Sequence, residues 1–522
     1  MYFPTRNLFL KKAKKGNIVP IYKEILADQE TPVSAFMRFK DKADNIYMLE
    51  SVEGNTNVGR YTFLGVGADT IITSKSKMFS ITTNGETNVK NVDSPIKELE
   101  RIVREYKPAM DSTLPPFYGG AVGYFGYDIV RFYENIPHEE KQDTLDVPDI
   151  YFMISKDVII FDRVTNSIKI VANAHVGKDK EAAYDDAVNR IKDMEQILLT
   201  SENVSADSGS SDIDELVFTS NTSKKDFMKI VERGKEYIRQ GDILQVVLSQ
   251  RWMLDKEIDP FAVYRHLRTI NPSPYMFFLK LGDMNLIGSS PEVMVKGGDG
   301  KIIVRPIAGT RPRGADEEQD NANEKELLSD EKERAEHVML VDLGRNDLGR
   351  IAVPGTVKVE DCMVIERYSH VMHIVSQVSA KLDDNVTWDD VLRAAFPAGT
   401  VSGAPKIRAM EIIEELEREH RGAYAGAVSY LAFSGNFDTC ITIRTIVQKD
   451  NKLYFQAGAG IVADSNPESE YYETVNKIKV LFSAVADSLG MSNIEFLEYE
   501  KDNSIIVREN KDSKQENIEE EQ

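Results

Sequence analysis

Two acidic pairs are the first residues whose types and spacing could do chemistry. Glu333 and Glu336 stand three apart in DEKERAEHVML, and Glu470 and Glu473 have the same spacing in NPESEYYETVNKIK. Spacing of three places each pair on one face of a helix. Four carboxylates brought together would repel one another unless a hard cation lay between them, and Mg²⁺ binds a few carboxylates while keeping waters and a substrate oxygen. The spacing alone is more typical of a solvated helix face.

A glycine-rich segment, LYFQAGAGIVADSNPESE, contains GxGxxA after a predicted strand and so imitates a dinucleotide-binding fingerprint. However, the next helix is predicted to begin only near Pro467, with Asn466 as its N-cap, and no acidic residue lies about 20 residues on to bind a ribose. Paired glycines, Gly458 and Gly460, also suit a carboxylate ligand. Arg444 in CITIRTIVQ, predicted inside an apolar strand, needs an anionic partner when buried, and this indicates a substrate that carries carboxylates.

Histidine and cysteine residues indicate little metal chemistry. His370 and His373 form an HxxH pair in a segment that alternates like a strand, where positions three apart face opposite sides. A shared metal is therefore disfavoured, and a hydrogen-bonded buried histidine is the ordinary expectation. Cys362 and Cys440 belong to no CxxC pair, which argues against a disulfide framework or a thiolate site and indicates a reducing compartment.

Composition limits the class of ligand. The chain has 522 residues, with 64 Lys and Arg against 85 Asp and Glu, a balance of −21. This acidity argues against a general nucleic-acid binder, because phosphate contacts need a basic face. No stretch approaches the roughly 18 apolar residues of a membrane span. The N-terminal NLFLKKAKKGN places its lysines after the apolar patch, unlike a signal peptide, so we expect a cytoplasmic protein that binds a small molecule.

Strands and helices must position these residues. Short β-branched runs such as TFLGV, TIITS, VIIFD and SIKIV predict strands and hairpins before residue 200. After residue 215, longer helical patterns, among them EKELLSDEKERAEHVMLVDL, alternate with strands. Several strands follow one another directly, which favours an α+β fold with large antiparallel sheets flanked by helices over βαβ winding.

Local composition suggests where the chain divides. The Ser-, Asp- and Gly-rich segment 200–215 predicts a flexible linker. We therefore expect an N-terminal domain over residues 1–199 and a catalytic domain over residues 216–487. Residues 488–522 form an acidic tail that ends in KDSKQENIEEEQ and is expected to be disordered.

Read together, these motifs resemble the large subunit (component I) of anthranilate synthases, within the chorismate-utilising enzymes. The match runs from about Tyr47 to Val485. It is carried by YMLES, GDILQVVLSQR, NPSPYMFFL, IGSSPEVMV, RPIAGTRPRG, EHVMLVDLGRNDLGR, SHVMHIVSQV, FPAGTVSGAPKIRAMEII, YAGAVSYL, CITIRT and QAGAGIVADSNPESEYYET. The resemblance implies the antiparallel fold of that family.

The resemblance also implies a magnesium site and a chorismate site. Mg²⁺ would bridge the ring carboxylate of chorismate to Glu336 and Glu473, with Glu333 and Glu470 acting through water. Residues that hold the enolpyruvyl carboxylate are matched by Tyr424 and Arg444. The loops around the substrate are matched by Gly309, Thr310, Gly458, Ala459 and Gly460.

Catalytic roles follow from the same match. Glu292 corresponds to the general acid that protonates the leaving 4-hydroxyl as ammonia adds at C2, and His373, with Thr310 in the same site, to the residue that transfers a proton when pyruvate is lost. Gln245 stands where isochorismate and salicylate synthases carry a water-activating lysine, and glutamine cannot be that base. Ala308 stands where aminodeoxychorismate synthases commonly carry a lysine nucleophile.

We therefore expect a carbon–oxygen lyase reaction that converts chorismate and ammonia into anthranilate, the first committed step of tryptophan biosynthesis. Aminodeoxychorismate synthase component I is the alternative. Neither cysteine has the glycine-flanked turn of a glutaminase nucleophile, so use of glutamine implies a separate glutamine amidotransferase subunit, component II, in a heterotetramer.

Two motifs imply regulation. YMLES and NPSPYM match an allosteric tryptophan site that the N-terminal domain helps to form and through which tryptophan would inhibit the enzyme. The matching positions are Glu50, Ser51, Pro274, Tyr275 and Met276.

Two other classes of protein make different demands on the sequence. A nucleotide-dependent oxidoreductase needs a helix directly after Gly460. A catalytically silent regulatory subunit would have lost the acidic pairs or Glu292. The sequence meets neither requirement.

Overall fold

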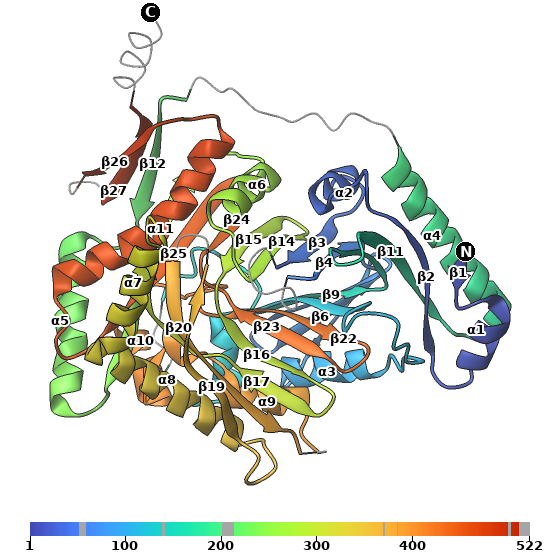
Figure 1. The fold of residues 1–522 in the computed structure, drawn as a ribbon, viewed down its shortest axis with the longest axis horizontal. Helices are drawn as coiled ribbons and strands as arrows, with labels where there is room; N and C mark the ends of the chain where they lie inside the picture. Colours follow the sequence, from blue (N-terminus) through green and yellow to red (C-terminus); the bar gives the residue numbers. More distant parts are fainter. Residues whose placement is uncertain are drawn as a thin grey trace, which may run out of the picture.

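Two large antiparallel sheets organise the chain (Figure 1). The computed structural model describes residues 1–51, 59–137, 141–200, 213–368, 371–383, 385–499 and 503–510. Over these residues one sheet has 15 strands and the other has 12. Helices cover the outer faces, so the predicted α+β class with antiparallel sheets is confirmed.

The larger sheet takes strands from both halves of the sequence, which meet where β3 pairs with β14. Its described strands are, in spatial order, β1 (Tyr2–Phe3), β2 (Ile18–Leu26), β11 (Ser167–His175), β10 (Asp157–Asp162), β4 (Tyr61–Val66), β3 (Asn45–Glu50), β14 (Tyr275–Leu281), β15 (Met284–Ser290), β24 (Thr445–Lys449), β25 (Lys452–Ile461), β13 (Gln245–Asp255), β12 (Glu215–Ser220), β27 (Ser504–Glu509) and β26 (Ile494–Tyr499), with β21 (Gly403–Ala404) paired to β13.

The smaller sheet is also shared, and its two halves meet where β22 pairs with β8. Its described strands are, in spatial order, β18 (Ile307–Pro312), β20 (Val371–Lys381), β17 (Lys301–Val304), β16 (Val293–Gly298), β23 (Phe437–Ile441), β22 (Ala427–Ala432), β8 (Gly120–Phe125), β9 (Ile150–Ser155), β5 (Thr70–Lys75), β6 (Met78–Thr83) and β7 (Glu86–Asn91), with β19 (Lys358–Arg367) paired to β20.

Helices pack on both sheets and carry much of the site. Those that contribute to the core on the larger sheet are α1 (Arg6–Lys12), α2 (Pro32–Phe39), α4 (Lys180–Leu199), α5 (Lys224–Gln240), α6 (Pro260–Ile270) and α11 (Pro467–Ser488). Those on the smaller sheet are α3 (Pro95–Arg104), α7 (Glu317–Ser329), α8 (Glu331–Gly349) and α9 (Trp388–Ala395). α10 (Lys406–Leu416) contributes to both cores, and two 3₁₀ turns, η1 (Tyr127–Phe132) and η2 (Gly399–Val401), complete the described helices.

Apolar side chains of the two sheets share one core. Tyr47 and Phe277 from the larger sheet are fully or almost fully buried with Val122 and Val428 from the smaller sheet. Burying each such side chain contributes about 1.5–3 kcal/mol. The packing of this shared core holds the two sheets in a defined position relative to each other.

The boundary predicted from composition divides the sequence but not the sheets. In each sheet the strands of the N-terminal half form one continuous block and those of the C-terminal half another, and the two blocks pair edge to edge at β3–β14 and at β8–β22. Most of the predicted linker, residues 201–212, lies outside the described residues. α4 ends at Leu199, and Glu215 already belongs to β12.

The prediction of a disordered tail over residues 488–522 is wrong for its first part. β26 and β27 form a hairpin that extends the larger sheet beyond β12. Ile505 and Val507 are buried there, whereas the prediction gave most weight to the charge at the chain end. Residues 511–522 lie outside the described residues.

One predicted helix is two. The pattern EKELLSDEKERAEHVMLVDL breaks at Asp330, which ends α7 and caps α8. The Asp330 carboxylate accepts hydrogen bonds from the backbone N–H groups of Lys332 and Glu333, and this fixes where α8 begins. No helix within the described ranges is long and apolar enough to cross a membrane.

Candidate active site

Both acidic pairs lie at helix starts, as predicted for Glu470 and Glu473; for Glu333 and Glu336 this follows from the unpredicted break at Asp330. Glu333 and Glu336 follow the Asp330 cap of α8, and Glu470 and Glu473 follow Asn466, whose side chain accepts hydrogen bonds from the first N–H groups of α11. Helix N-termini favour negative charge. The caps therefore set the direction of four carboxylates that come from distant parts of the sequence.

The two helices bring their carboxylates near each other. Burial raises the pKa of Glu336, and the charges of Glu333 and Glu473 raise it further. Burial and the charge of Glu473 also raise the pKa of Glu470, against a hydrogen bond from Ser465. These four carboxylates, Glu333, Glu336, Glu470 and Glu473, are called the acidic group below. They are crowded, and a cation placed among them would relieve their repulsion.

This set of donors fits a magnesium ion. Carboxylate oxygens are the ligands that Mg²⁺ prefers, and it commonly completes its shell with water and substrate oxygens. Among the described side chains, no group of three or more His, Cys, Asp and Glu is placed so that the protein alone could hold a metal ion, so a bound Mg²⁺ would need oxygens from water and substrate. Two cationic side chains already reach these carboxylates. Lys477 Nζ lies 2.6 Å from Glu473 Oε1 and donates to the Gly458 carbonyl at 2.9 Å, and Arg311 Nη1 lies 3.4 Å from Glu333 Oε1.

The glycine strand β25 lies beside two of the predicted substrate residues. A Cβ on Gly458 would approach the Tyr424 hydroxyl to 2.8 Å, and one on Gly460 would approach Gln245 Nε2 to 2.6 Å. Gly458 therefore has no room for a side chain, because the Leu248 backbone carbonyl would also lie 2.9 Å from its Cβ, whereas a side chain at Gly460 would displace the Gln245 amide. Ala459, between them, is buried opposite Leu248 of β13.

Arg444 differs from its predicted place. It lies in the bend between β23 and β24 with φ of 50°, not inside a strand. Burial lowers the pKa of Arg444, while the nearby Tyr424 raises it. Among the described residues no carboxylate forms an ion pair with this half-buried guanidinium. An arginine in this state is suited to bind an anionic ligand bidentately.

Glu292 has the properties of an acid. It precedes β16, and its Oε1 accepts a hydrogen bond of 2.9 Å from the Thr400 hydroxyl in η2. Burial raises the pKa of Glu292 to about 8, although the hydrogen bond and the charge of Lys477 act in the other direction. The carboxyl is thus protonated at neutral pH and can donate a proton.

His373 lies on β20 of the smaller sheet, between β18 and β19. Its Nδ1 lies 3.0 Å from Thr310 Oγ1 and 3.1 Å from the Gly309 carbonyl. A carbonyl only accepts hydrogen bonds, so Nδ1 carries the proton and Nε2 the lone pair. Gly309 has φ of 70° at a bulge, and a Cβ there would lie 3.2 Å from Glu333 Oε2. Gly309 in the bulge thus lies next to both His373 and Glu333 of the acidic group. His370 lies outside the described residues.

The five predicted regulatory positions line one cavity of about 200 Å³ between the sheets. Ser51, Pro274, Tyr275 and Met276 face it together with Glu50. The Glu50 carboxylate is already engaged, because it accepts hydrogen bonds from the Tyr264 hydroxyl and from Arg268 and Arg163.

Sequence reasoning missed several residues of these sites. Thr400 was inside a recognised motif but had no local signal for its contact with Glu292. Lys477 had one, because it stands four residues after Glu473 on the same helix. Lys296 and Asp438, an ion pair of 2.7 Å in the cavity, come from strands that only the fold brings together.

Crowded carboxylates, a glutamic acid whose pKa burial raises and, among the described residues, an arginine without a carboxylate partner fit an enzyme that binds a small acidic substrate. The sequence profile described as chorismate binding enzyme matches residues 44–483, and the chain belongs to this family. It is 48% identical over 94% of its length to anthranilate synthase component 1 of Acetivibrio thermocellus, covering 99% of that protein.

Two further relatives agree. The chain is 47% identical to anthranilate synthase component 1 of Aquifex aeolicus, with 92% of this chain and 98% of that protein covered. The crystal structure of anthranilate synthase component I from Streptococcus pneumoniae matches with a TM-score of 0.73 and 38% identity, over 88% of this chain and 98% of that one. These matches confirm the predicted resemblance and that the chain is an enzyme of this kind.

Proposed function

We propose that the chain converts chorismate to anthranilate by magnesium-dependent amination followed by loss of pyruvate. The observation that carries this proposal is the hydrogen bond from Thr400 to Glu292, whose pKa burial raises to about 8 and whose carboxyl feels the charge of Lys477, the ion-pair partner of Glu473. A substrate with two carboxylates and a leaving hydroxyl needs an acid, a cation site and an arginine. The three lie in one region of this fold.

Substrate binding is shared between two ends of the site. Glu336 and Glu473 would hold Mg²⁺, with Glu333 and Glu470 acting through water. When bound, the ion would polarise and anchor the ring carboxylate. Arg444 and Tyr424 would bind the enolpyruvyl carboxylate. The chorismate ring would be lined by the backbone N–H groups of Gly309, Thr310, Gly458, Ala459 and Gly460.

The first step joins ammonia to the ring. As the C2–N bond forms, the two ring double bonds shift and the C4–O bond breaks, and Glu292 donates its proton to the departing oxygen, which leaves as water. In the second step His373 takes the proton from C2, the electrons form the C2–C3 double bond as the C3–O bond breaks, and the enolpyruvyl group leaves as the enolate of pyruvate, which takes up a proton at its methylene carbon to become pyruvate. The ring is then aromatic and carries the amino group of anthranilate.

Two positions favour this reaction over its neighbours. Gln245 is buried and lies against Gly460, where an amide can contact a nucleophile but cannot deprotonate water. Ala308 is buried and offers no amine to attack the ring. Aminodeoxychorismate synthase component I is the alternative function.

Glutamine use would require a partner. Burial raises the pKa of Cys440, which argues against that thiol as a nucleophile. We infer a separate glutamine amidotransferase subunit, a heterotetramer as the working assembly, and the cytoplasm as its location. The cavity of about 200 Å³ lined by Ser51 and Met276 would bind tryptophan as the feedback inhibitor.

Product identification tests the proposal. The purified chain is incubated with chorismate, Mg²⁺ and an ammonium salt, and the products are separated by chromatography. Anthranilate and pyruvate in equal amounts are expected. Aminodeoxychorismate would favour the alternative, and isochorismate or salicylate would contradict direct use of ammonia.

A further inference from the structure

Glu417 and Arg421 form a buried ion pair near the candidate site. Within the described residues, the pair forms no hydrogen bond to Glu292 or to the carboxylates of α8 and α11. Glu417 follows α10, and Arg421 stands four residues further on. Their exposures are 7% and 2%. Arg421 donates from Nε to Glu417 Oε2 at 2.9 Å and from Nη2 to Glu417 Oε1 at 2.6 Å. The ion pair is thus bidentate and almost inaccessible to solvent.

The remaining donors of Arg421 reach two segments of the site. Nη1 donates to the Val401 carbonyl at 2.7 Å, and Nη2 also donates to the Val247 carbonyl at 2.8 Å. Val401 belongs to η2, next to Thr400, whose hydroxyl donates to Glu292. One guanidinium therefore ties β13 to the turn that positions the acid.

The same guanidinium lies between two aromatic rings. Its carbon is 4.7 Å from the ring centre of Tyr127 and 5.5 Å from that of Tyr424. Tyr424 in turn presses its hydroxyl toward Gly458, which is why that position has no room for a side chain. Arg421 thus also supports the phenol that faces the substrate loop.

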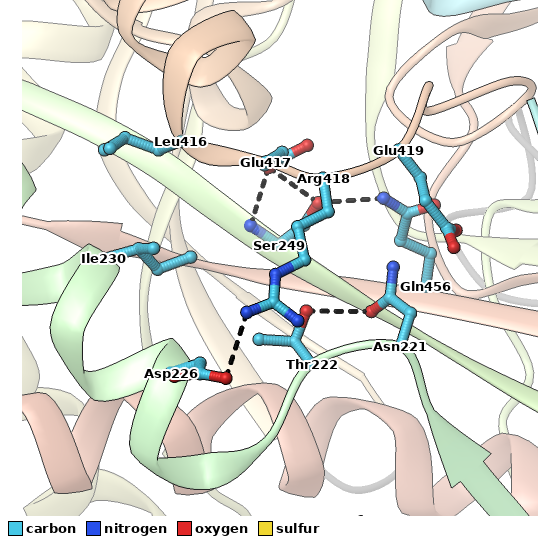
Figure 2. Close-up of a pocket in the computed structure, with 10 residues that line it drawn as sticks. All are labelled: Asn221, Thr222, Asp226, Ile230, Ser249, Leu416, Glu417, Arg418, Glu419 and Gln456. Carbon is cyan, nitrogen blue, oxygen red and sulfur yellow. Dashed lines mark hydrogen bonds and ion pairs between the residues drawn. The ribbon is translucent and has the colours of Figure 1, made fainter. Parts of the chain in front are cut away.

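Glu417 extends the network to the glycine strand. Its Oε1 accepts hydrogen bonds of 2.8 Å from the Ser249 backbone N–H and from the Ser249 hydroxyl. That hydroxyl accepts from Gln456 Nε2 at 2.9 Å, and Gln456 stands two residues before Gly458. Figure 2 shows Ser249 between Glu417 and Gln456 at the edge of a small polar cavity.

Stability is a poor explanation for this pair. Taking two charges out of water is costly, and replacing a buried ion pair by apolar residues of similar volume is often neutral or stabilising. What apolar residues cannot supply is the set of directed hydrogen bonds to Val401, Val247 and Ser249.

We propose that Arg421, oriented by Glu417, is a positioning residue that holds the Thr400 turn and the Tyr424 ring in the arrangement needed for proton donation by Glu292 and for substrate binding. The inference deepens the proposed function, because it assigns the groups that align its acid. Arg421 acts through Thr400 and Tyr424 and contacts no reacting atom.

The test compares Arg421→Lys, Thr400→Val and the double variant in the full-length chain, with ammonium salt as the nitrogen source. Arg421→Lys keeps a charge but loses the fork of donors. Its kcat is expected to fall about tenfold or more, since small misplacements of reacting groups have large effects on rate. KM for chorismate should rise only a few-fold. The double variant should be little worse than Thr400→Val, because both changes break one chain of contacts.

Arg408→Lys is the matched control. Arg408 lies within α10 and, like Arg421, donates from Nε and Nη2 to one carboxylate, that of Asp242. Its side chain is much more exposed than that of Arg421. Its kcat and KM should be unchanged. Thermal unfolding is measured for every variant to compare stabilities.

Three results would overturn the inference: a kcat of Arg421→Lys equal to that of the Arg408→Lys control, effects of Arg421→Lys and Thr400→Val that multiply, or loss of activity only in proportion to loss of folded protein. If Arg421→Lys does not fold, Glu417→Met combined with Arg421→Met replaces it, with the same expected fall in kcat. Failure of the proposed function is distinguishable, because the unmodified chain would then form no anthranilate.

Discussion

The chemistry of single residues here depends on how much water each carboxyl retains. Glu292 is half-buried, accepts one hydroxyl hydrogen bond and has a raised pKa, whereas Glu473 near the start of α11 is more exposed and forms an ion pair with Lys477. Different surroundings therefore suit the same side chain to donate a proton in one place and to bind a cation in another.

Glu292→Gln should stop the first half of the reaction. General acid catalysis contributes about 100-fold or more, so chorismate consumption should slow by at least about that factor. His373→Met should instead continue to consume chorismate and accumulate the aminated ring that still carries its enolpyruvyl group. Chromatography of stopped reactions distinguishes the two variants. Equal loss of chorismate consumption in both would refute this division of roles.

The same substitution should change how stability depends on pH. Burial raises the pKa of Glu292 to about 8, so the folded carboxyl keeps its proton where the unfolded one is ionised. The free energy of unfolding then falls as the pH rises from about 4 to about 8. Glu292→Gln removes this slope. Between pH 4 and pH 8, its free energy of unfolding should therefore rise by about 1 kcal/mol or more relative to that of the wild type. Urea unfolding at several pH values measures it, and parallel curves would mean that Glu292 titrates normally.

The cation site can be tested without relying on activity alone. We expect Mg²⁺ to raise the melting temperature of the unmodified chain in the presence of chorismate, and Glu336→Gln and Glu473→Gln should abolish both this rise and turnover. Since burial and neighbouring carboxylates raise the pKa of Glu336, its neutral substitute should stabilise the metal-free protein.

Glu333→Gln should have a smaller effect than these two substitutions. Glu468→Gln on α11, whose partner is Lys224 at the surface, is the matched control and should behave like wild type. Retention of the Mg²⁺-dependent stabilisation by both ligand variants would exclude this site.

At the level of elements, local signals predicted what local interactions decide. The start of α11 follows from Asn466 and Pro467, and the stripe of Val475, Ile478 and Phe482 is buried as its spacing predicts. The break at Asp330 was also local but was hidden by continuous helix formers on both sides. Cap residues are thus more informative than propensity when a helix continues in a new direction.

Other elements depend on contacts that the sequence does not display. Arg444 takes a left-handed conformation because two strands must bend apart there, whereas its apolar neighbours predicted a straight strand. The β26–β27 hairpin forms because β12 offers it an edge more than 270 residues earlier in the chain, a pairing no local pattern reveals. The contacts of Thr400 with Glu292 and of Arg421 with Val401 have the same origin.

The pairing of β3 with β14 carries the regulatory prediction. Ser51 follows β3 and Met276 lies in β14, so both face the cavity between the sheets. Ser51→Phe and Met276→Thr should each weaken inhibition by tryptophan about tenfold while leaving kcat largely unchanged, because typical couplings between sites are about 1–3 kcal/mol. Inhibition curves measure this, with Met78→Thr on the exposed strand β6 as control. Tryptophan affinity that saturating chorismate leaves unchanged would contradict the coupling.

At the level of the whole molecule, shared sheets explain how such distant sites can communicate. β16 begins directly after Glu292 and carries Lys296 into the cavity, so one strand touches both sites. Both sheets continue through both halves of the chain, and a shift of one sheet against the other would move the acid and the cavity together.

The central claim is that this chain adds ammonia directly to chorismate and then releases pyruvate. The most direct measurement supplies isotopically labelled ammonium, chorismate and Mg²⁺ to the purified chain and analyses the product by mass spectrometry. We predict anthranilate that carries one labelled nitrogen per molecule of pyruvate released, and none from the Glu292→Gln variant. Unlabelled isochorismate or salicylate, or labelled product that retains its enolpyruvyl group at the end of the reaction, would contradict the account.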